Sequence, residues 1–137
     1  NGVDDSRRPF SITANSADQT DAKSTLVELL APEADVLLDD GTWVALTARK
    51  GVFDNEKQIL ELSGGVNLFH DKGYEFSTSS AIFDLAAGDA IGTEKVEGQG
   101  SFGRLQAEGF RLYNRGQNVE FTGKTKLLIL PKKGDEK

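Results

Sequence analysis

The sequence predicts an all-β domain, and three observations carry that prediction. Apolar and polar residues alternate with a period of two from residue 42 onwards, as in Leu60 and Leu62 against Glu61 and Ser63. Side chains on successive residues of a strand point to opposite faces, so this alternation is typical of half-buried strands. Glycine accounts for 15 of the 137 residues, about 11% against a typical 7%. No window carries a sustained helical stripe.

Length and composition exclude several classes of protein. A chain of 137 residues is one domain and can bury a core without disulfides or metal. The 22 acidic and 16 basic residues give a net charge of −6, which repels a phosphate backbone and argues against nucleic-acid binding. Cysteine is absent, which removes thiol catalysis and thiolate metal sites. Methionine is absent even at position 1, so we expect Asn1 to begin a fragment or a processed form.

The predicted strands follow one another between short polar turns. We expect strands at 10–14, 44–49, 60–68, 74–79 and 96–103, and one long last strand at 119–130. Turn residues such as Asp71-Lys72-Gly73 and Ala87-Gly88-Asp89 separate them. Residues 22–31 could form a single helical turn that Pro32 ends, but we interpret them as a strand. The domain is expected to span 10–130, between a flexible segment 1–9 and a charged tail 131–137.

An internal repeat of about 30 residues runs through the chain. A unit of the form apolar-x-small-x-x-apolar/small starts at Ile12, Leu46, Phe76 and Leu105. A second unit, apolar-x-Gly, lies between these starts. This period indicates stacked two-strand units that bury one another's faces. The alternative is an ordinary all-β domain with loosely spaced strands and glycine turns.

The inward face of these strands mixes large side chains with Ala, Gly and Thr. Two sheets facing each other would hide this face. Small inward residues either leave an apolar slot between the sheets or serve the twist and bulges of a solid sandwich. The residues expected to point inward are Ile12, Ala14, Leu29, Val44, Leu46, Leu60, Leu62, Val66, Leu68, Phe76, Phe83, Leu105, Leu112, Val119, Phe121 and Leu127.

The two ends of the stack are expected to be open strand edges. The first strand and the long last strand lie at opposite ends, and an unpaired edge readily adds a strand from another chain. The alternative is that Lys124 and Lys126 block the last edge.

No catalytic set emerges from the sequence, so we predict that the protein is not an enzyme and needs no cofactor or metal. His70 is the only histidine and is interpreted as a surface turn residue. Trp43 is expected to be a partly buried strand aromatic, and Val96–Gly103 a strand with bulges. A carbohydrate-active enzyme would need a carboxylate pair, and nothing singles one out. Arg7 and Arg8 are interpreted as an exposed terminal pair.

Several short motifs together resemble the LptC family of OstA-like lipopolysaccharide-export proteins. The opening Arg8-Pro9-Phe10-Ser11-Ile12-Thr13-Ala14 fits that family. The resemblance continues through 41–54, 60–68, 73–78, Val96-Glu97-Gly98-Gln99-Gly100 and 121–127, and covers nearly the whole chain. The related soluble bridge protein LptA shares the repeat, so an LptA-like bridge is the nearest alternative.

The resemblance implies a twisted antiparallel β-jellyroll, partly open along one side, in the Gram-negative periplasm. It implies an anchor to the inner membrane through a single N-terminal helix absent from this chain. The domain would receive lipopolysaccharide from an inner-membrane ABC transporter and pass it to LptA by edge-to-edge strand association. A structural adaptor that binds no lipid is the alternative, and an edge-to-edge homodimer remains open.

The resemblance also assigns roles to individual residues. The lipid-binding residues would be Ile12, Ala14, Val44, Leu46, Leu62, Val66, Leu68, Phe76, Thr78, Phe83, Leu105, Leu112 and Phe121. The edge facing the transporter would carry Phe10, Ile12 and Ala14. The edge facing LptA would carry Val119, Phe121, Gly123, Leu127 and Ile129. Small inward residues would make room for acyl chains.

Overall fold

The computed structural model describes residues 10–131 except Thr20, Asp39 and Gly116. The predicted segment 1–9, with Arg7 and Arg8, and the tail from 132 onwards lie outside the described residues. No helix capable of crossing a membrane lies within the part that the structure describes. The described residues form fourteen strands: β1 Phe10–Thr13, β2 Ser16–Gln19, β3 Leu26–Leu30, β4 Glu33–Leu37, β5 Trp43–Thr47, β6 Lys50–Asp54, β7 Ile59–His70, β8 Glu75–Asp84, β9 Asp89–Gly92, β10 Val96–Gly100, β11 Gly103–Ala107, β12 Gly109–Tyr113, β13 Asn118–Thr122 and β14 Lys126–Ile129.

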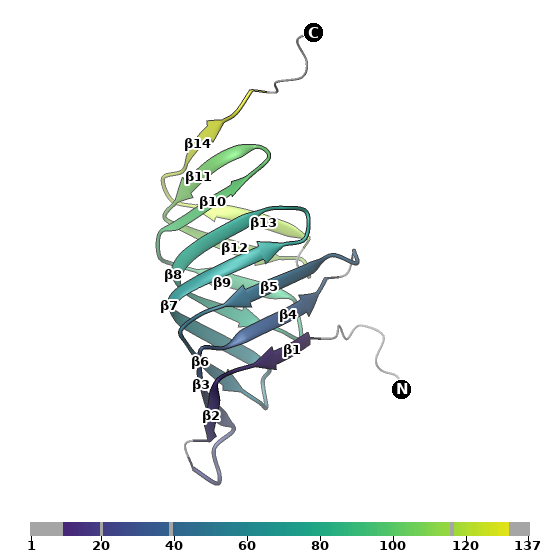
Figure 1. Cartoon of the computed structure of the whole chain (residues 1–137), viewed down its shortest axis with the longest axis vertical. Coiled ribbons are helices and arrows are strands. Elements are labelled where there is room, and N and C mark those ends of the chain that lie inside the picture. Colours follow the sequence, from purple (N-terminus) through teal and green to yellow (C-terminus); the bar gives the residue numbers. More distant parts are fainter. Residues whose placement is uncertain (1–9, 20, 39, 116, 132–137) are drawn as a thin grey trace.

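These strands form one open antiparallel sheet folded into two arms. Arm I has the order β1-β4-β5-β7-β8-β10-β11-β14, and arm II has the order β2-β3-β6-β7-β8-β9-β12-β13. The long strands β7 and β8 belong to both arms and join them. The strands lie across the long axis of the molecule, with β2 at one end and β14 at the other (Figure 1). The fold is therefore a two-layered jellyroll whose first and last strands do not meet.

The internal repeat marks the corners at which the chain crosses from one arm to the other. In the second unit, Leu46 lies near the end of β5 in arm I, and Gly51 lies near the start of β6 in arm II. Leu46 and Gly51 are both buried, although they are an odd number of residues apart. A regular strand would place them on opposite faces. The corner thus shifts the alternation by one residue, which explains the spacing of the repeat.

The predicted long strand 119–130 is wrong in one respect. The chain turns at Gly123, whose φ is +75°, and splits the segment into β13 on arm II and β14 on arm I. Glycine suits this position because a positive φ is unfavourable for residues with a Cβ. The C-terminal end of the molecule consequently presents two short edge strands on different arms.

A bulge bends β7 between its two halves. Its pairing with β8 shifts register between Ser63 and Val66. The intervening Gly64 and Gly65 have φ values of +79° and +96°. The predicted strand 96–103 is wrong: β10 ends at Gly100, residues 101–102 form a turn, and Gly103 begins β11. The predicted bulges do not occur, because β10 pairs in regular register with both β8 and β11. Residues 22–31 contain the strand β3, as expected.

The part of the molecule built from β3 to β7 has a closely packed core. Leu46 on arm I is 1% exposed, and Leu60 and Leu62 on arm II are 0% and 2% exposed. A space of only about 20 Å³ remains near Val36 and Leu46, enough for about one water molecule. We call this part the closed half and the part from β8 to β14 the open half.

Candidate functional site

A cavity of about 450 Å³ lies between the two arms, mainly in the open half. Its walls are apolar side chains from both arms, with polar groups at its rim. Concave apolar sites with a few polar groups are the usual form of ligand pockets. The lining residues are Leu38, Asp40, Val44, Val66, Leu68, His70, Lys72, Tyr74, Phe76, Thr78, Ala81, Phe83, Val96, Phe102, Phe110, Leu112, Gln117, Val119 and Phe121.

The rim of the cavity is polar and hydrogen-bonded. Asp40 accepts hydrogen bonds from the Thr42 hydroxyl at 2.6 Å and from the Thr42 backbone N–H at 3.0 Å. These two bonds, in that order, lower the pKa of Asp40, and the nearby charges of Lys72 and His70 lower it further. The rim therefore carries a carboxylate at neutral pH, with the charge of Lys72 nearby.

His70 belongs to this rim. It ends β7, and its side chain is 20% exposed, so the prediction of a surface turn residue is only partly right. Its Nδ1 accepts a hydrogen bond from the Lys72 backbone N–H at 3.1 Å, and its ring lies 5.5 Å from that of Tyr74. An accepting Nδ1 places the proton of the neutral ring on Nε2. The imidazole thus closes the tight turn between β7 and β8.

Most of the residues predicted to bind lipid line the cavity. These are Val44, Val66, Leu68, Phe76, Thr78, Phe83, Leu112 and Phe121. Leu46 and Leu62 instead lie in the closed half, within the buried core. Ile12 and Ala14 lie half-buried at the N-terminal end, and Leu105 lies beyond the cavity towards β14.

Sequence reasoning missed part of the wall. Phe102 stacks on Tyr74 with ring centroids 5.8 Å apart. Tyr74 shares the alternation of Phe76, so the pattern could have identified it. Phe102 lies in the turn between β10 and β11, where the alternation of a strand gives no signal. Phe110 follows the corner between β11 and β12, which shifts the alternation of inward and outward residues by one residue.

The inward glycines do not supply the empty space, contrary to expectation. A Cβ on Gly98 would collide with the ring of Phe76, and a Cβ on Gly92 would collide with the ring of Phe110. In each case the aromatic residue is the direct cross-strand partner of the glycine. A Cβ on Gly51 would lie 3.0 Å from Leu62. Neighbouring side chains therefore cover these glycines, and the cavity results from the spacing of the arms.

Both ends of the sheet keep unpaired strand edges among the described residues. β1 pairs with β4 alone and β2 with β3 alone, while β14 pairs with β11 alone and β13 with β12 alone. Phe10 and Ile12 lie in β1, and Ala14 follows it. Val119 and Phe121 lie in β13, Gly123 forms the corner, and Leu127 and Ile129 lie in β14.

The C-terminal edge is strongly apolar and open to solvent. All four residues of β14 are exposed, and Ile129 reaches 66%. Val119 on the neighbouring edge is 52% exposed. Exposed apolar edge strands are a liability unless another chain covers them. Lys126, which we considered as an edge-blocking residue, lies within β14 beside these apolar side chains.

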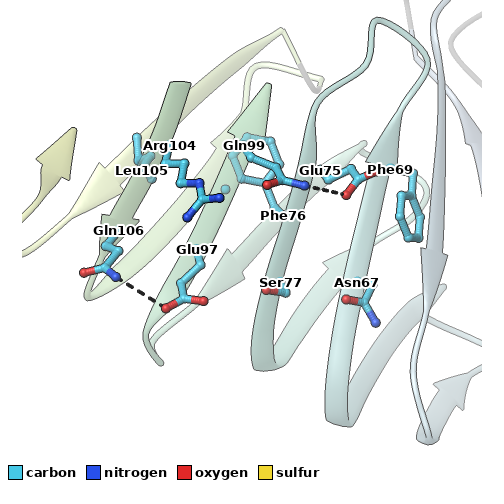
Figure 2. Close-up of a pocket in the computed structure, with 11 residues that line it drawn as sticks. Asn67, Phe69, Glu75, Phe76, Ser77, Glu97, Gln99, Arg104, Leu105 and Gln106 are labelled. Atoms are coloured by element: carbon cyan, nitrogen blue, oxygen red, sulfur yellow. Dashed lines mark hydrogen bonds between the residues drawn. The ribbon is translucent and has the colours of Figure 1, made fainter. Parts of the chain in front are cut away.

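A second hollow of about 400 Å³ lies on the outer face of arm I, across β7, β8, β10 and β11 (Figure 2). The Gln99 amide donates to Glu75 at 3.1 Å, and the Gln106 amide donates to Glu97 at 3.5 Å. These outward side chains stabilise the solvated face of the sheet, whereas the apolar cavity lies on the opposite face.

Comparison with known proteins first identifies the class. The chain is similar to the crystal structure of LptH from Pseudomonas aeruginosa, described as the LptA homologous periplasmic component of the lipopolysaccharide transport device. The TM-score is 0.71 at 10% sequence identity, and the match covers 90% of this chain and 96% of that chain. The fold is thus that of the LptA-like jellyrolls.

A comparison of the sequence with models of protein families identifies the family. The model of the family "Lipopolysaccharide-assembly, LptC-related" matches residues 4–129, so the chain belongs to the LptC-related family. None of the curated proteins compared with the chain matches it significantly.

Membership of this family and the fold confirm the predicted identity. The protein functions in lipopolysaccharide transport in the periplasm. The family consists of transport bridge proteins, and its partners are lipopolysaccharide and components of the Lpt pathway such as LptA.

Proposed function

We propose that the cavity between the arms holds an acyl chain of lipopolysaccharide while the lipid moves from an inner-membrane ABC transporter to LptA. The observation that carries this proposal is the apolar cavity of about 450 Å³ bounded by both arms. One water molecule occupies about 30 Å³ of liquid, and a methylene group is of similar size. The cavity therefore has room for on the order of 15 such groups, about one acyl chain.

The energetics favour such a lining. Each methylene shielded from water contributes about 0.8 kcal/mol, so a chain of about a dozen carbons is stabilised by roughly 10 kcal/mol when it is buried. A lipid that crosses an aqueous compartment therefore needs continuous apolar cover. The domain supplies this cover passively, and ATP hydrolysis in the transporter drives the movement.

A row of inward residues crosses arm I from edge to edge and supports a directional path. Each member is the cross-strand partner of the next, and the row connects the two predicted partner edges. The row is Ile12, Ala34, Leu46, Leu68, Phe76, Gly98, Leu105 and Leu127. Adding a strand to β1 or to β14 would extend this row into a neighbouring jellyroll.

The edges take different partners in this proposal. The edge of β1, with Phe10, Ile12 and the following Ala14, meets the jellyroll domains of the transporter. The edges of β13 and β14 meet LptA, because their exposed apolar side chains gain cover on association. An N-terminal helix in the inner membrane, as the family implies, would hold the domain beside the transporter.

A photo-crosslinking pair on one strand tests the lipid path. A crosslinker at Phe76 points into the cavity, and one at the adjacent Ser77 points to the outer face. We expect lipopolysaccharide to label position 76 at least about ten-fold more than position 77, since burial of a few methylenes already exceeds 1.4 kcal/mol. Equal labelling at both positions would contradict the proposal.

The solid packing of the closed half favours a second candidate, a structural adaptor that acts through its edges alone. This candidate predicts capture of LptA through β14 without labelling at Phe76. Pull-down and crosslinking on the same preparation therefore separate the two functions.

A further inference from the structure

The aromatic rings of Phe76 and Phe121 bridge the two arms. Phe76 lies on β8 in arm I, and Phe121 lies on β13 in arm II. Their ring centroids are 5.7 Å apart, and the rings are tilted by 35°. Among the ring pairs of the described residues, this pair alone joins the arms. The His70–Tyr74 and Tyr74–Phe102 pairs both lie within arm I, at the turns that connect its strands.

Along the inward row of arm I, the lining of the cavity ends at Phe76. Both rings line the cavity, whereas Leu105 and Leu127 do not. Leu105 and Leu127 are the next side chains of the inward row towards the C-terminal edge, beyond Gly98. The two rings thus separate the cavity from the apolar surface on which a lipid would leave the domain.

The two rings are supported unequally. The ring of Phe76 lies against Gly98 of the central strand β10. Phe121 lies on an edge strand whose single partner among the described strands is β12. Phe121 is therefore the ring that a strand docking on β13 would reach first.

We propose that Phe76 and Phe121 form a gate that retains the acyl chain until a partner docks on the C-terminal edge. This inference rests on the proposed function, because a gate requires a lipid in the cavity. The closed gate favours retention, and displacement of the Phe121 ring joins the cavity to Leu105 and Leu127. Docking and release are thereby coupled through one residue of β13.

The test measures retention and transfer separately. The domain carries a photo-crosslinker at Leu112, which lines the cavity on β12. Lipopolysaccharide is loaded, and labelling at position 112 is followed after dilution into phosphatidylcholine vesicles, first without LptA and then with it. We expect Phe121→Leu to lose the lipid about two- to ten-fold faster than the parent without LptA, the factor expected for one aromatic pair.

Matched variants make the result specific. Phe69→Ala removes a phenylalanine ring from the outer face of arm I and is expected to release lipid at the parent rate. Phe76→Leu alone and the double variant Phe76→Leu/Phe121→Leu are expected to release at nearly the rate of Phe121→Leu, because either change already breaks the pair. Leucine preserves the apolar character at both positions, which protects folding.

Each outcome decides the question. Release from Phe121→Leu at the parent rate, with normal initial labelling at position 112, would overturn the gate and leave the lipid path intact. Additive acceleration in the double variant would also overturn it, since the two rings would then act independently. A lack of labelling at position 112 in the parent protein would overturn the proposed function itself.

Discussion

The closed and open halves of the molecule share one sequence pattern but differ in packing. In the closed half, Leu46 and Leu60 are fully buried in the core to which both arms contribute. In the open half, Phe76 and Leu112 occupy equivalent inward positions and remain half-buried around the cavity. Atoms that line an empty space lose dispersion contacts. The closed half therefore stabilises the arms, and this allows the open half to remain partly empty.

The largest expected effect is on stability, from removing a side chain of the closed half. Leu60→Ala should lower the free energy of unfolding by about 2–5 kcal/mol, the usual range for a fully buried leucine. Leu112→Ala should lower it by only about 1 kcal/mol, because that side chain is already partly exposed. Urea unfolding measures both. Equal losses would show that the two halves are packed alike.

The next effect concerns the open end of arm I. Gly103 has a φ of +129°, and a Cβ there would collide with the backbone carbonyl of Leu128 in β14. Gly103→Ala should therefore detach β14 and destabilise the fold by about 1–3 kcal/mol. Hydrogen exchange of the β14 amides and capture of LptA provide the measurements.

Gly41→Ala is the matched control for this change. Gly41 also has a positive φ of +89°, but a Cβ there would meet nothing within 4 Å. We expect backbone strain without loss of β14 protection. If both variants expose β14 equally, the collision with Leu128 is not the cause.

The smallest expected effect is on the acid stability of the cavity rim. The folded pKa of Asp40 is lowered from its usual 3.8, first by the Thr42 hydroxyl. The stabilisation by this carboxylate is fully present above pH 3.8 and is lost as the pH falls through the lower folded pKa. Thr42→Val should raise the pKa of Asp40 in an NMR titration. Asp54, whose lowered pKa arises first from the Lys57 backbone N–H, should titrate unchanged.

Much of the fold could be predicted from local pattern. The alternation of Leu60, Leu62, Val66 and Leu68 identified the inward face of β7, and every one of these residues packs in or against the core. The sequence revealed the repeat but not its structural role, because the spacing of a motif does not indicate that the chain crosses from one arm to the other at that position. The error at 119–130 has the same origin, since alternation continues in phase across Gly123.

The candidate site was less predictable. The inward residues of both halves look alike in sequence, so Leu46 and Phe76 received the same interpretation. Small inward residues were interpreted as room for acyl chains, but the Phe76 ring, which lies on another strand, covers Gly98. Contacts between strands distant in sequence decided both cases.

The sequence by itself determined the all-β class, the inward face of several strands, the two terminal edges and the LptC-related family, because alternation, glycine turns and motif order are local properties of the chain. The tertiary structure alone decided where the arms touch and where they leave a cavity, how Phe76 meets Phe121, and that the last segment splits between two arms. These features depend on the separation of two sheets, and that separation is set by all the side chains packed between them.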